Sequence, residues 1–179
     1  DINLPNQAYM KVLFANRPHA IVRAIDTRAA EALPGVLAVF TAKDVPVNEY
    51  GLIMNDQPVL CGPGSSKPYA DRVRFVGDQV ALVIAESEEI AARGRDLIRV
   101  DYEDLPVVTD VVEAMKAGEE SAYNAPLLHP EKGSNVFCHY LIRKGEVEAG
   151  LAEADVVVEE EYHTPAQEHA FLQPEAGIA

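Results

Sequence analysis

Short apolar runs, rich in β-branched and aromatic residues, recur along residues 1–118 and are separated by polar segments. Runs of this length favour strands, because successive side chains of a strand point to opposite faces and alternate runs can fill a core. The predicted strands are 8–14, 21–25, 36–41, 72–76, 79–85 and 100–103. Between two of them, Gly77-Asp78 indicates a hairpin turn or a bulge.

Three helices are predicted, each after a residue whose side chain can accept a hydrogen bond from the first turn. The caps are Asp26 or Thr27 for a helix ending near Leu33, Ser87 for one ending near Arg99, and Asp110 for one that Gly118 closes. This mixture of strands and helices predicts an α+β fold. A long loop at 44–68, rich in Pro, Gly, Asn and Ser, is a candidate functional segment, since long loops in compact domains often are.

Residues 119–134 form a polar connector that contains two prolines and a glycine, which is typical of a domain boundary. We therefore expect one domain at 1–118, a linker at 119–134 and the start of a second domain at 135–179. In the second region the pattern predicts strands at 136–143 and 155–162 around a short helix at 146–153. The chain starts at Asp1 and stops on an apolar, strand-like Gly177-Ile178-Ala179, so we expect it to be a piece of a longer protein.

Charge and cysteine content narrow the possible partners. The 179 residues carry a formal net charge of −14 and are 48% hydrophobic. Such a charge repels phosphate backbones and anionic membrane surfaces, so neither nucleic acid nor membrane is an expected partner. Cys61 and Cys138 are far apart and match no metal-binding spacing, which excludes a disulfide framework and an iron–sulfur site within the chain. A cytoplasmic location is the default expectation.

Few motifs carry chemistry. The sequence contains no phosphate-binding loop, dinucleotide fingerprint or nucleophile elbow. His163, Glu168, His169 and Glu175 match no zinc spacing, so no metal ligand is assigned. Cys61 is interpreted as a small buried residue rather than a nucleophile. Gln167, next to an apolar turn, could present a neutral amide in a pocket, although most glutamines lie on the surface.

Six strings occur in a recognisable order. They are Asn16-Arg17-Pro18-His19-Ala20, Ala24-Ile25-Asp26-Thr27, Leu33-Pro34-Gly35-Val36, Phe40-Thr41-Ala42-Lys43-Asp44-Val45-Pro46, Arg74-Phe75-Val76-Gly77-Asp78-Gln79-Val80-Ala81 and Val100-Asp101-Tyr102-Glu103-Asp104-Leu105-Pro106. Together they resemble the molybdenum hydroxylase family of xanthine dehydrogenases, aldehyde oxidases and aldehyde oxidoreductases. The resemblance implies an α/β hammerhead domain, followed by the first strands of a molybdopterin-binding domain.

The same resemblance implies a function. Gln167 matches the family's glutamine that hydrogen-bonds an oxo ligand of molybdenum, and it is the one cofactor-binding residue assigned. Family members hydroxylate an aldehyde or N-heterocycle carbon with oxygen from water, and electrons leave through iron–sulfur clusters to FAD or another acceptor on other domains or subunits. The family's catalytic base, a glutamate, lies beyond Ala179, so no catalytic residue is assigned and this chain alone is expected to be inactive. Pro165-Ala166 and Gln173 depart from the family pattern, which leaves the substrate open.

The expected partners are therefore the remainder of a large subunit, iron–sulfur and flavin domains or subunits, and a small-molecule substrate. Two alternatives stay open at this point. The chain could be a non-catalytic hammerhead scaffold or split subunit that binds partner chains. It could also be an unrelated hydrolase that uses His163, Glu168 and His169 as metal ligands. The loop at 44–68 is a hypothetical wall of the substrate funnel.

Overall fold

The computed structural model describes residues 3–52, 55–116, 126–170, 172 and 177–179. The chain divides into two compact units, Asp1–Phe137 (unit 1) and Cys138–Ala179 (unit 2), and each is described by itself.

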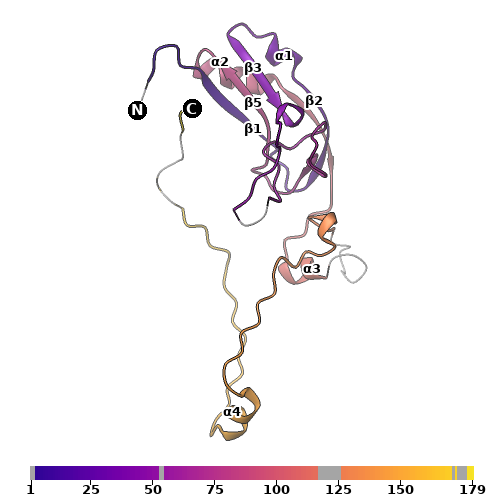
Figure 1. Ribbon diagram of the computed structural model, residues 1–179, viewed down its shortest axis with the longest axis vertical. Coiled ribbons are helices and arrows are strands. Elements are labelled where there is room, and N and C mark those ends of the chain that lie inside the picture. Colours follow the sequence, from indigo (N-terminus) through magenta and orange to yellow (C-terminus); the bar gives the residue numbers. More distant parts are fainter. Residues whose placement is uncertain (1–2, 53–54, 117–125, 171, 173–176) are drawn as a thin grey trace. The chain divides into compact units, whose positions relative to one another are not determined.

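The described part of unit 1 is built on two antiparallel sheets of three strands each (Figure 1). Sheet A has the order β1-β5-β3, and its strands are β1 (Tyr9–Phe14), β5 (Gln79–Ala85) and β3 (Val36–Thr41). Sheet B has the order β4-β2-β6, and its strands are β4 (Arg72–Val73), β2 (Ala20–Asp26) and β6 (Arg99–Asp104). Both sheets therefore join segments that are far apart in the sequence.

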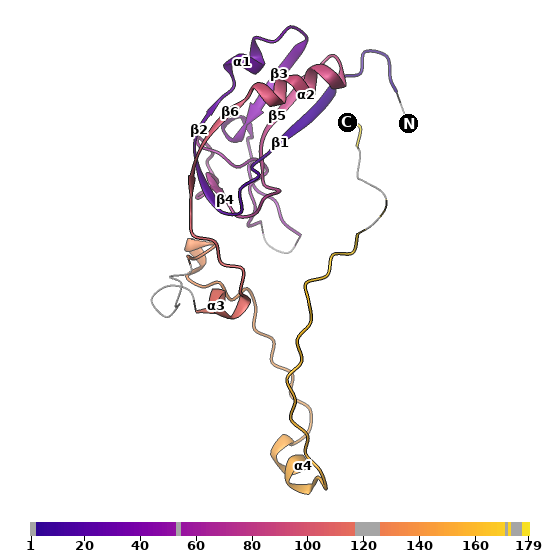
Figure 2. The same cartoon turned by 180° about the vertical axis from the view of Figure 1, so that it is seen from behind.

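One helix covers one face of sheet A. Helix α2 (Glu88–Leu97) packs on β1 and β5 and lies on the near side of the sheet in Figure 2. Its first turn is capped by Ser87, whose hydroxyl accepts a hydrogen bond from the Ile90 N–H at 3.2 Å. Gly94 allows the close approach, since an added Cβ would lie 2.9 Å from Val83 Cγ1.

The shorter helices punctuate the connections of the fold. They are α1 (Arg28–Glu31), the 3-10 turn η1 (Ala42–Asp44), α3 (Val111–Met115) and the 3-10 turn η2 (Pro130–Lys132). Asp110 caps α3 by accepting hydrogen bonds from the N–H groups of Val112 and Glu113. Thr27 stands at the N-cap of α1 but makes no capping bond, because its hydroxyl donates to Glu31.

The core has two adjoining clusters of buried side chains. One contains Ala15, Ala20, Val22, Cys61, Val73 and Val80, and the other contains Ala30, Ala81, Val83 and Ile98. Ile25 and Val100 pack against both clusters, so the two sheets share one continuous apolar interior. Burial of such side chains is the main force that holds the unit together.

The sequence predicts most elements of unit 1 correctly. Strands 36–41 and 79–85 and the caps Ser87 and Asp110 are confirmed. The strand predicted at 72–76 is limited to Arg72–Val73, and α2 ends two residues before Arg99, where β6 begins. The closing residue Gly118, and with it the predicted domain end, lies outside the described residues.

Gly77-Asp78 forms neither the expected hairpin nor a bulge between paired strands. The strands on either side of it belong to different sheets, β4 to sheet B and β5 to sheet A. The Asp78 carboxylate accepts hydrogen bonds from the N–H groups of Arg74 (2.6 Å) and Phe75 (3.3 Å). These amides are satisfied within the turn, so the chain can leave one sheet and enter the other without pairing the strands.

In unit 2, the helix expected at 146–153 is present as α4 (Val147–Glu153). The strands expected at 136–143 and 155–162 do not form, and the residues of these segments are almost all exposed. A strand needs a neighbour for its main-chain hydrogen bonds. The described residues of these two segments pair with no strand, so the Val-rich pattern alone does not produce a sheet.

Candidate functional site

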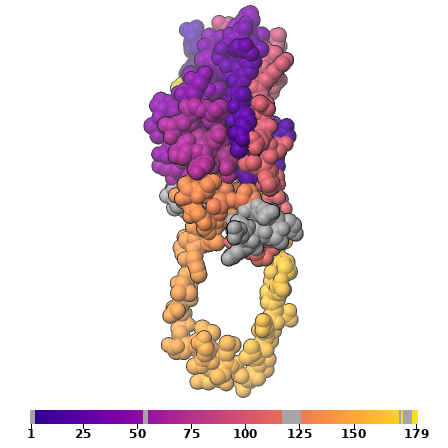
Figure 3. Space-filling view, turned by 90° about the vertical axis from the view of Figure 1, so that its right-hand side faces the viewer, coloured from indigo at the N-terminus to yellow at the C-terminus, as the bar shows by residue number. Residues whose placement is uncertain are grey.

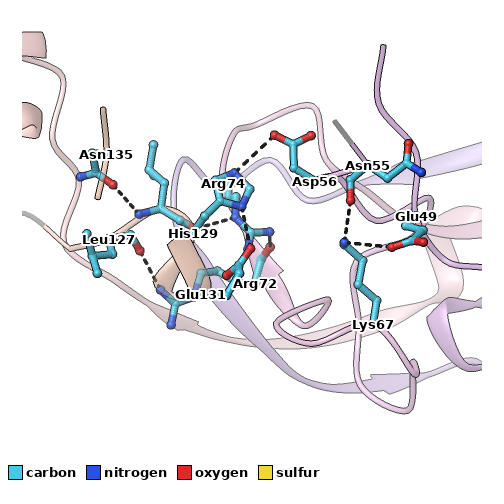
Figure 4. Close-up of polar contacts among 11 residues, drawn as sticks. Glu49, Asn55, Asp56, Lys67, Arg72, Arg74, Leu127, His129, Glu131 and Asn135 are labelled. Atoms are coloured by element: carbon cyan, nitrogen blue, oxygen red, sulfur yellow. Dashed lines mark hydrogen bonds and ion pairs between the residues drawn. The ribbon is translucent and has the colours of Figure 1, made fainter. Parts of the chain in front are cut away.

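Polar side chains of β4 and of the connector meet at one end of unit 1 (Figure 4). Arg72 Nη1 donates a hydrogen bond to the carbonyl oxygen of Leu127 at 3.3 Å. Arg74 Nε donates to the carbonyl oxygen of Leu128 at 2.7 Å, which is the geometry of a strong charge-assisted bond. In the space-filling view, the connector residues that follow residue 125 (orange) lie against the magenta segment that contains β4 (Figure 3).

Asn135 completes this attachment from the other side of the connector. Its side-chain oxygen accepts a hydrogen bond from Leu128 N–H at 2.9 Å. Its amide nitrogen donates to the carbonyl oxygens of Ala114 and Pro126, both at 3.0 Å. We call Arg72, Arg74 and Asn135 the connector clamp, because together they fix the main chain of the connector to β4 and α3.

His129 lies beside the connector clamp, between two carboxylates. Its Nε2 is 3.8 Å from the Asp56 carboxylate and its Nδ1 is 3.4 Å from the Glu131 carboxylate. Burial acts to raise the pKa of Glu131, but its own main-chain N–H and the charges of His129 and Arg74 outweigh this and lower the pKa. Burial also lowers the pKa of the Arg74 guanidinium, which still stays charged at neutral pH.

The loop at 44–68 is held by one buried amide. Asn48 is 1% exposed, and its Nδ2 donates to the Leu60 carbonyl oxygen and to the Ser65 hydroxyl, both at 2.9 Å. Its Oδ1 accepts from the Leu60 N–H at 2.9 Å. Further along the loop, Lys67 Nζ donates to the Asn55 carbonyl oxygen at 3.0 Å. No local pattern singles out Asn48, since its partners are twelve and more residues away.

A small cavity of about 60 Å³ lies between the strand ends and the connector. His19, one of its lining residues, is 4% exposed and donates from Nδ1 to the Pro106 carbonyl oxygen at 2.8 Å. Its Nε2 is buried and has no partner among the described residues. A cavity of this size admits a water molecule or two and no organic substrate.

Cys61 is confirmed as a buried residue, 1% exposed, within the core cluster beside Val73 and Val80. Burial, assisted by the negative charge of Asp78, raises the pKa of the thiol to about 12. A thiol that holds its proton at neutral pH is a poor nucleophile. Cys138, in contrast, is free and exposed.

Gln167 lies in unit 2 with its side chain exposed. Its amide makes no hydrogen bond to any described residue, so the two N–H donors are free for another group. The described residues offer this one neutral donor and form no wall around it. The chemistry of a free amide donor suits an oxo group, but the cradle for a cofactor has to include other residues.

The histidines of unit 2 do not form a shared site. His163 Nε2 is 2.7 Å from the Glu161 carboxylate, and His169 Nδ1 is 3.9 Å from that of Glu168. Both imidazoles are more than four-fifths exposed, and no three potential ligands converge within the described part of the chain. Glu175 lies outside that part. This geometry does not favour the hydrolase alternative.

Two family models match successive parts of the chain. Residues 1–106 match the model described as "Aldehyde oxidase and xanthine dehydrogenase, a/b hammerhead domain". Residues 128–179 match "Molybdopterin cofactor-binding domain". None of the helices in the described residues is both long and apolar enough to cross a bilayer.

Curated relatives agree with these matches. A probable xanthine dehydrogenase subunit of Bacillus subtilis is 39% identical over 180 residues, which cover all of this chain and 22% of the relative. A nicotinate dehydrogenase large molybdopterin subunit of Eubacterium barkeri is 29% identical over all of this chain and 39% of its own length. The chain thus spans between about a fifth and two-fifths of these relatives.

Solved structures are similar to the same part of the chain. CO dehydrogenase from Oligotropha carboxidovorans matches with a TM-score of 0.56 and 35% identity, over 64% of this chain and 14% of that one. Aldehyde oxidoreductase from Desulfovibrio gigas matches with a TM-score of 0.55 and 31% identity, over 69% of this chain and 14% of that one.

Proposed function

This chain belongs to the aldehyde oxidase and xanthine dehydrogenase family, and from that membership we propose that it is the N-terminal part of the large, molybdopterin-binding subunit of a molybdenum hydroxylase. The enzyme would hydroxylate a carbon of an aldehyde or N-heterocycle with oxygen from water. The resemblance drawn from the six sequence strings is thereby confirmed at the level of family and of the α+β hammerhead fold.

The observation that carries the proposal is the order of the two family segments in one chain. The hammerhead match ends at residue 106 and the molybdopterin cofactor-binding match begins at residue 128. The carbonyl oxygen of Leu128 is the acceptor for Arg74, so the connector clamp holds the chain where the second match begins. A rigid attachment there is useful in an enzyme whose domains must present a cofactor in a fixed position.

Gln167 is the residue of this chain that we propose to contact the cofactor. When bound, the molybdenum-molybdopterin group supplies the redox chemistry, and the protein supplies binding and electrostatics. A glutamine amide donates a hydrogen bond without adding charge and without competing as a metal ligand. Its role would be to orient and polarise an oxygen ligand of the metal from outside the coordination sphere.

The partners follow from the same proposal. The names of two relatives, "large molybdopterin subunit" and "large chain", describe those proteins as parts of multi-subunit enzymes. We propose that the complete protein works with the remainder of its subunit and with iron–sulfur and flavin domains or subunits, in the cytoplasm. Since a hydroxylation of this kind releases two electrons, an acceptor is required.

The test is to express the full-length polypeptide that carries this sequence, together with the proteins encoded beside its gene. Molybdenum would be measured by elemental analysis, and turnover by dye reduction with aldehydes, N-heterocycles and carbon monoxide in parallel. We expect stoichiometric molybdenum and dye reduction with at least one of these substrate classes. A folded, correctly assembled complex without molybdenum would refute the proposal and favour the non-catalytic scaffold.

A further inference from the structure

The two faces of sheet A differ in what covers them. On one face, Lys11, Leu13 and Val83 point toward the helix side, where Lys11 pairs with Glu88 of α2 and Val83 belongs to the core. Side chains alternate along a strand, so the residues between these point to the opposite face. In the view of Figure 1, the strands of sheet A lie in front of α2 and show this outer face.

The register places two complete apolar rows across this outer face. Met10 pairs with Ile84, which pairs with Ala38. Val12 pairs with Leu82, which pairs with Phe40. Met10 is 55% exposed and Phe40 is 38% exposed, while the other four side chains are half-buried by their neighbours in the sheet. We call these six residues the sheet A face.

Sheet B provides an internal contrast. On β6, Val100 and Tyr102 pack against the core, while Asp101 and Glu103 between them are exposed. Arg23 of β2 donates from Nε to the Glu103 carboxylate at 2.7 Å. The outer face of sheet B is thus charged and paired, as expected of a sheet surface that faces water. None of the six residues of the sheet A face is charged, which is typical of a surface that another apolar surface covers.

The size and charge of the face select among possible occupants. Its exposed apolar area is roughly a few hundred Å², the range in which apolar patches mark interfaces. A stable interface between separate proteins buries about 800 Å² per partner, and two copies of a chain with a net charge of −14 repel each other. A segment of the same polypeptide needs less area, because the covalent link gives it a high effective concentration.

We infer that the sheet A face is the docking surface for an apolar segment of the same polypeptide outside these 179 residues. This inference rests on the proposed function, in which the chain is part of a larger subunit; it spans 22% of the length of the Bacillus subtilis relative. Docking would place the face in a domain interface of the subunit and would shield it from water.

Cysteine accessibility tests the inference. In a Cys138→Ser background, which removes the exposed thiol while Cys61 stays buried, Phe40→Cys reports on the sheet A face. Asp101→Cys, on the exposed outer face of sheet B, is the matched control. The rate of maleimide coupling would be compared between the 179-residue chain and the full-length polypeptide. Met10→Cys on the neighbouring strand gives a second reporter if one variant fails to fold.

We expect coupling at position 40 to be at least about tenfold slower in the full-length polypeptide, because the docked segment has to open first. Coupling at position 101 should be unchanged. Equal rates at positions 40 and 10 in both proteins would overturn the inference. Protection that grows with the concentration of the isolated chain would also overturn it, since a second copy would then be the occupant. Molybdenum content of the same samples reports separately on the proposed function: protection without molybdenum rejects only the function, and molybdenum without protection rejects only the docking.

Discussion

Replacing Arg74 by methionine should release the connector while leaving the sheets intact. Methionine keeps most of the apolar stem of the side chain and removes the donor to the Leu128 carbonyl oxygen, a bond of 2.7 Å. A hydrogen bond with one charged partner contributes about 1.5–3 kcal/mol, and the half-buried position of Arg74 limits screening by water. We take about 2 kcal/mol as the loss, which corresponds to roughly a 30-fold change in a local opening equilibrium.

Hydrogen exchange measures that opening directly. The peptide that spans 126–135 should exchange about 30-fold faster in Arg74→Met under conditions where closing is faster than exchange. A peptide from β5 should exchange as in the parent protein, because its amides bond to β1 and β3. Arg23→Met, which removes an exposed ion pair with Glu103 on sheet B, is the control and should leave 126–135 unchanged. Exchange of 126–135 within about threefold of the parent in Arg74→Met would refute the reasoning.

Three further predictions concern single residues. In the complete enzyme, Gln167→Ala should lower kcat/KM by about 1–3 kcal/mol of transition-state stabilisation, with Gln7→Ala as the surface control, and unchanged kinetics would reject its assignment. Gly94→Ala should gain about 1 kcal/mol in helix propensity but lose about 1–3 kcal/mol through contact with Val83 at 2.9 Å, so urea denaturation should show a net loss; a gain would mean that α2 moves freely. Burial raises the pKa of Cys61 from 9.0 to about 12, so the unfolded chain loses this proton at lower pH than the folded one. Stability should therefore fall as pH rises from about 9 toward 12, and this part of the fall should vanish in Cys61→Ala but remain in Cys138→Ala.

The fold is predictable where local pattern and final environment agree. β3 and β5 lie where their apolar runs predict, because both become parts of a sheet that packs on the core. Ser87 and Asp110 act as caps for reasons that are confined to one turn. The Val-rich run at 155–162 has the same local signal as β3, but without a neighbouring strand it forms no ladder. Strand pairing is a property of two segments, and one of them can lie outside the sequence at hand.

The candidate site is predictable only in part, for a similar reason. Gln167 is assigned by resemblance and stays a prediction, since its surroundings in the described residues are open. The connector clamp and Asn48 are not predicted from the sequence. Arg74 and Leu128 are brought together by tertiary folding, and nothing in their local sequence marks them as partners. Buried amides and charged donors of this kind are recognised from their contacts rather than from their residue type.

The pairing of the strands also sets the order in which the chain can fold as it is synthesised. In the described residues β1, β2 and β3 do not pair with one another, and each of them bonds only to β4, β5 or β6. The first three strands therefore leave the ribosome with their apolar residues unpaired and must wait until the second half of the unit follows. Such long-range pairing is slow and leaves the nascent chain open to aggregation. A chain of this topology places its demand on chaperones early in translation, well before any cofactor can be inserted.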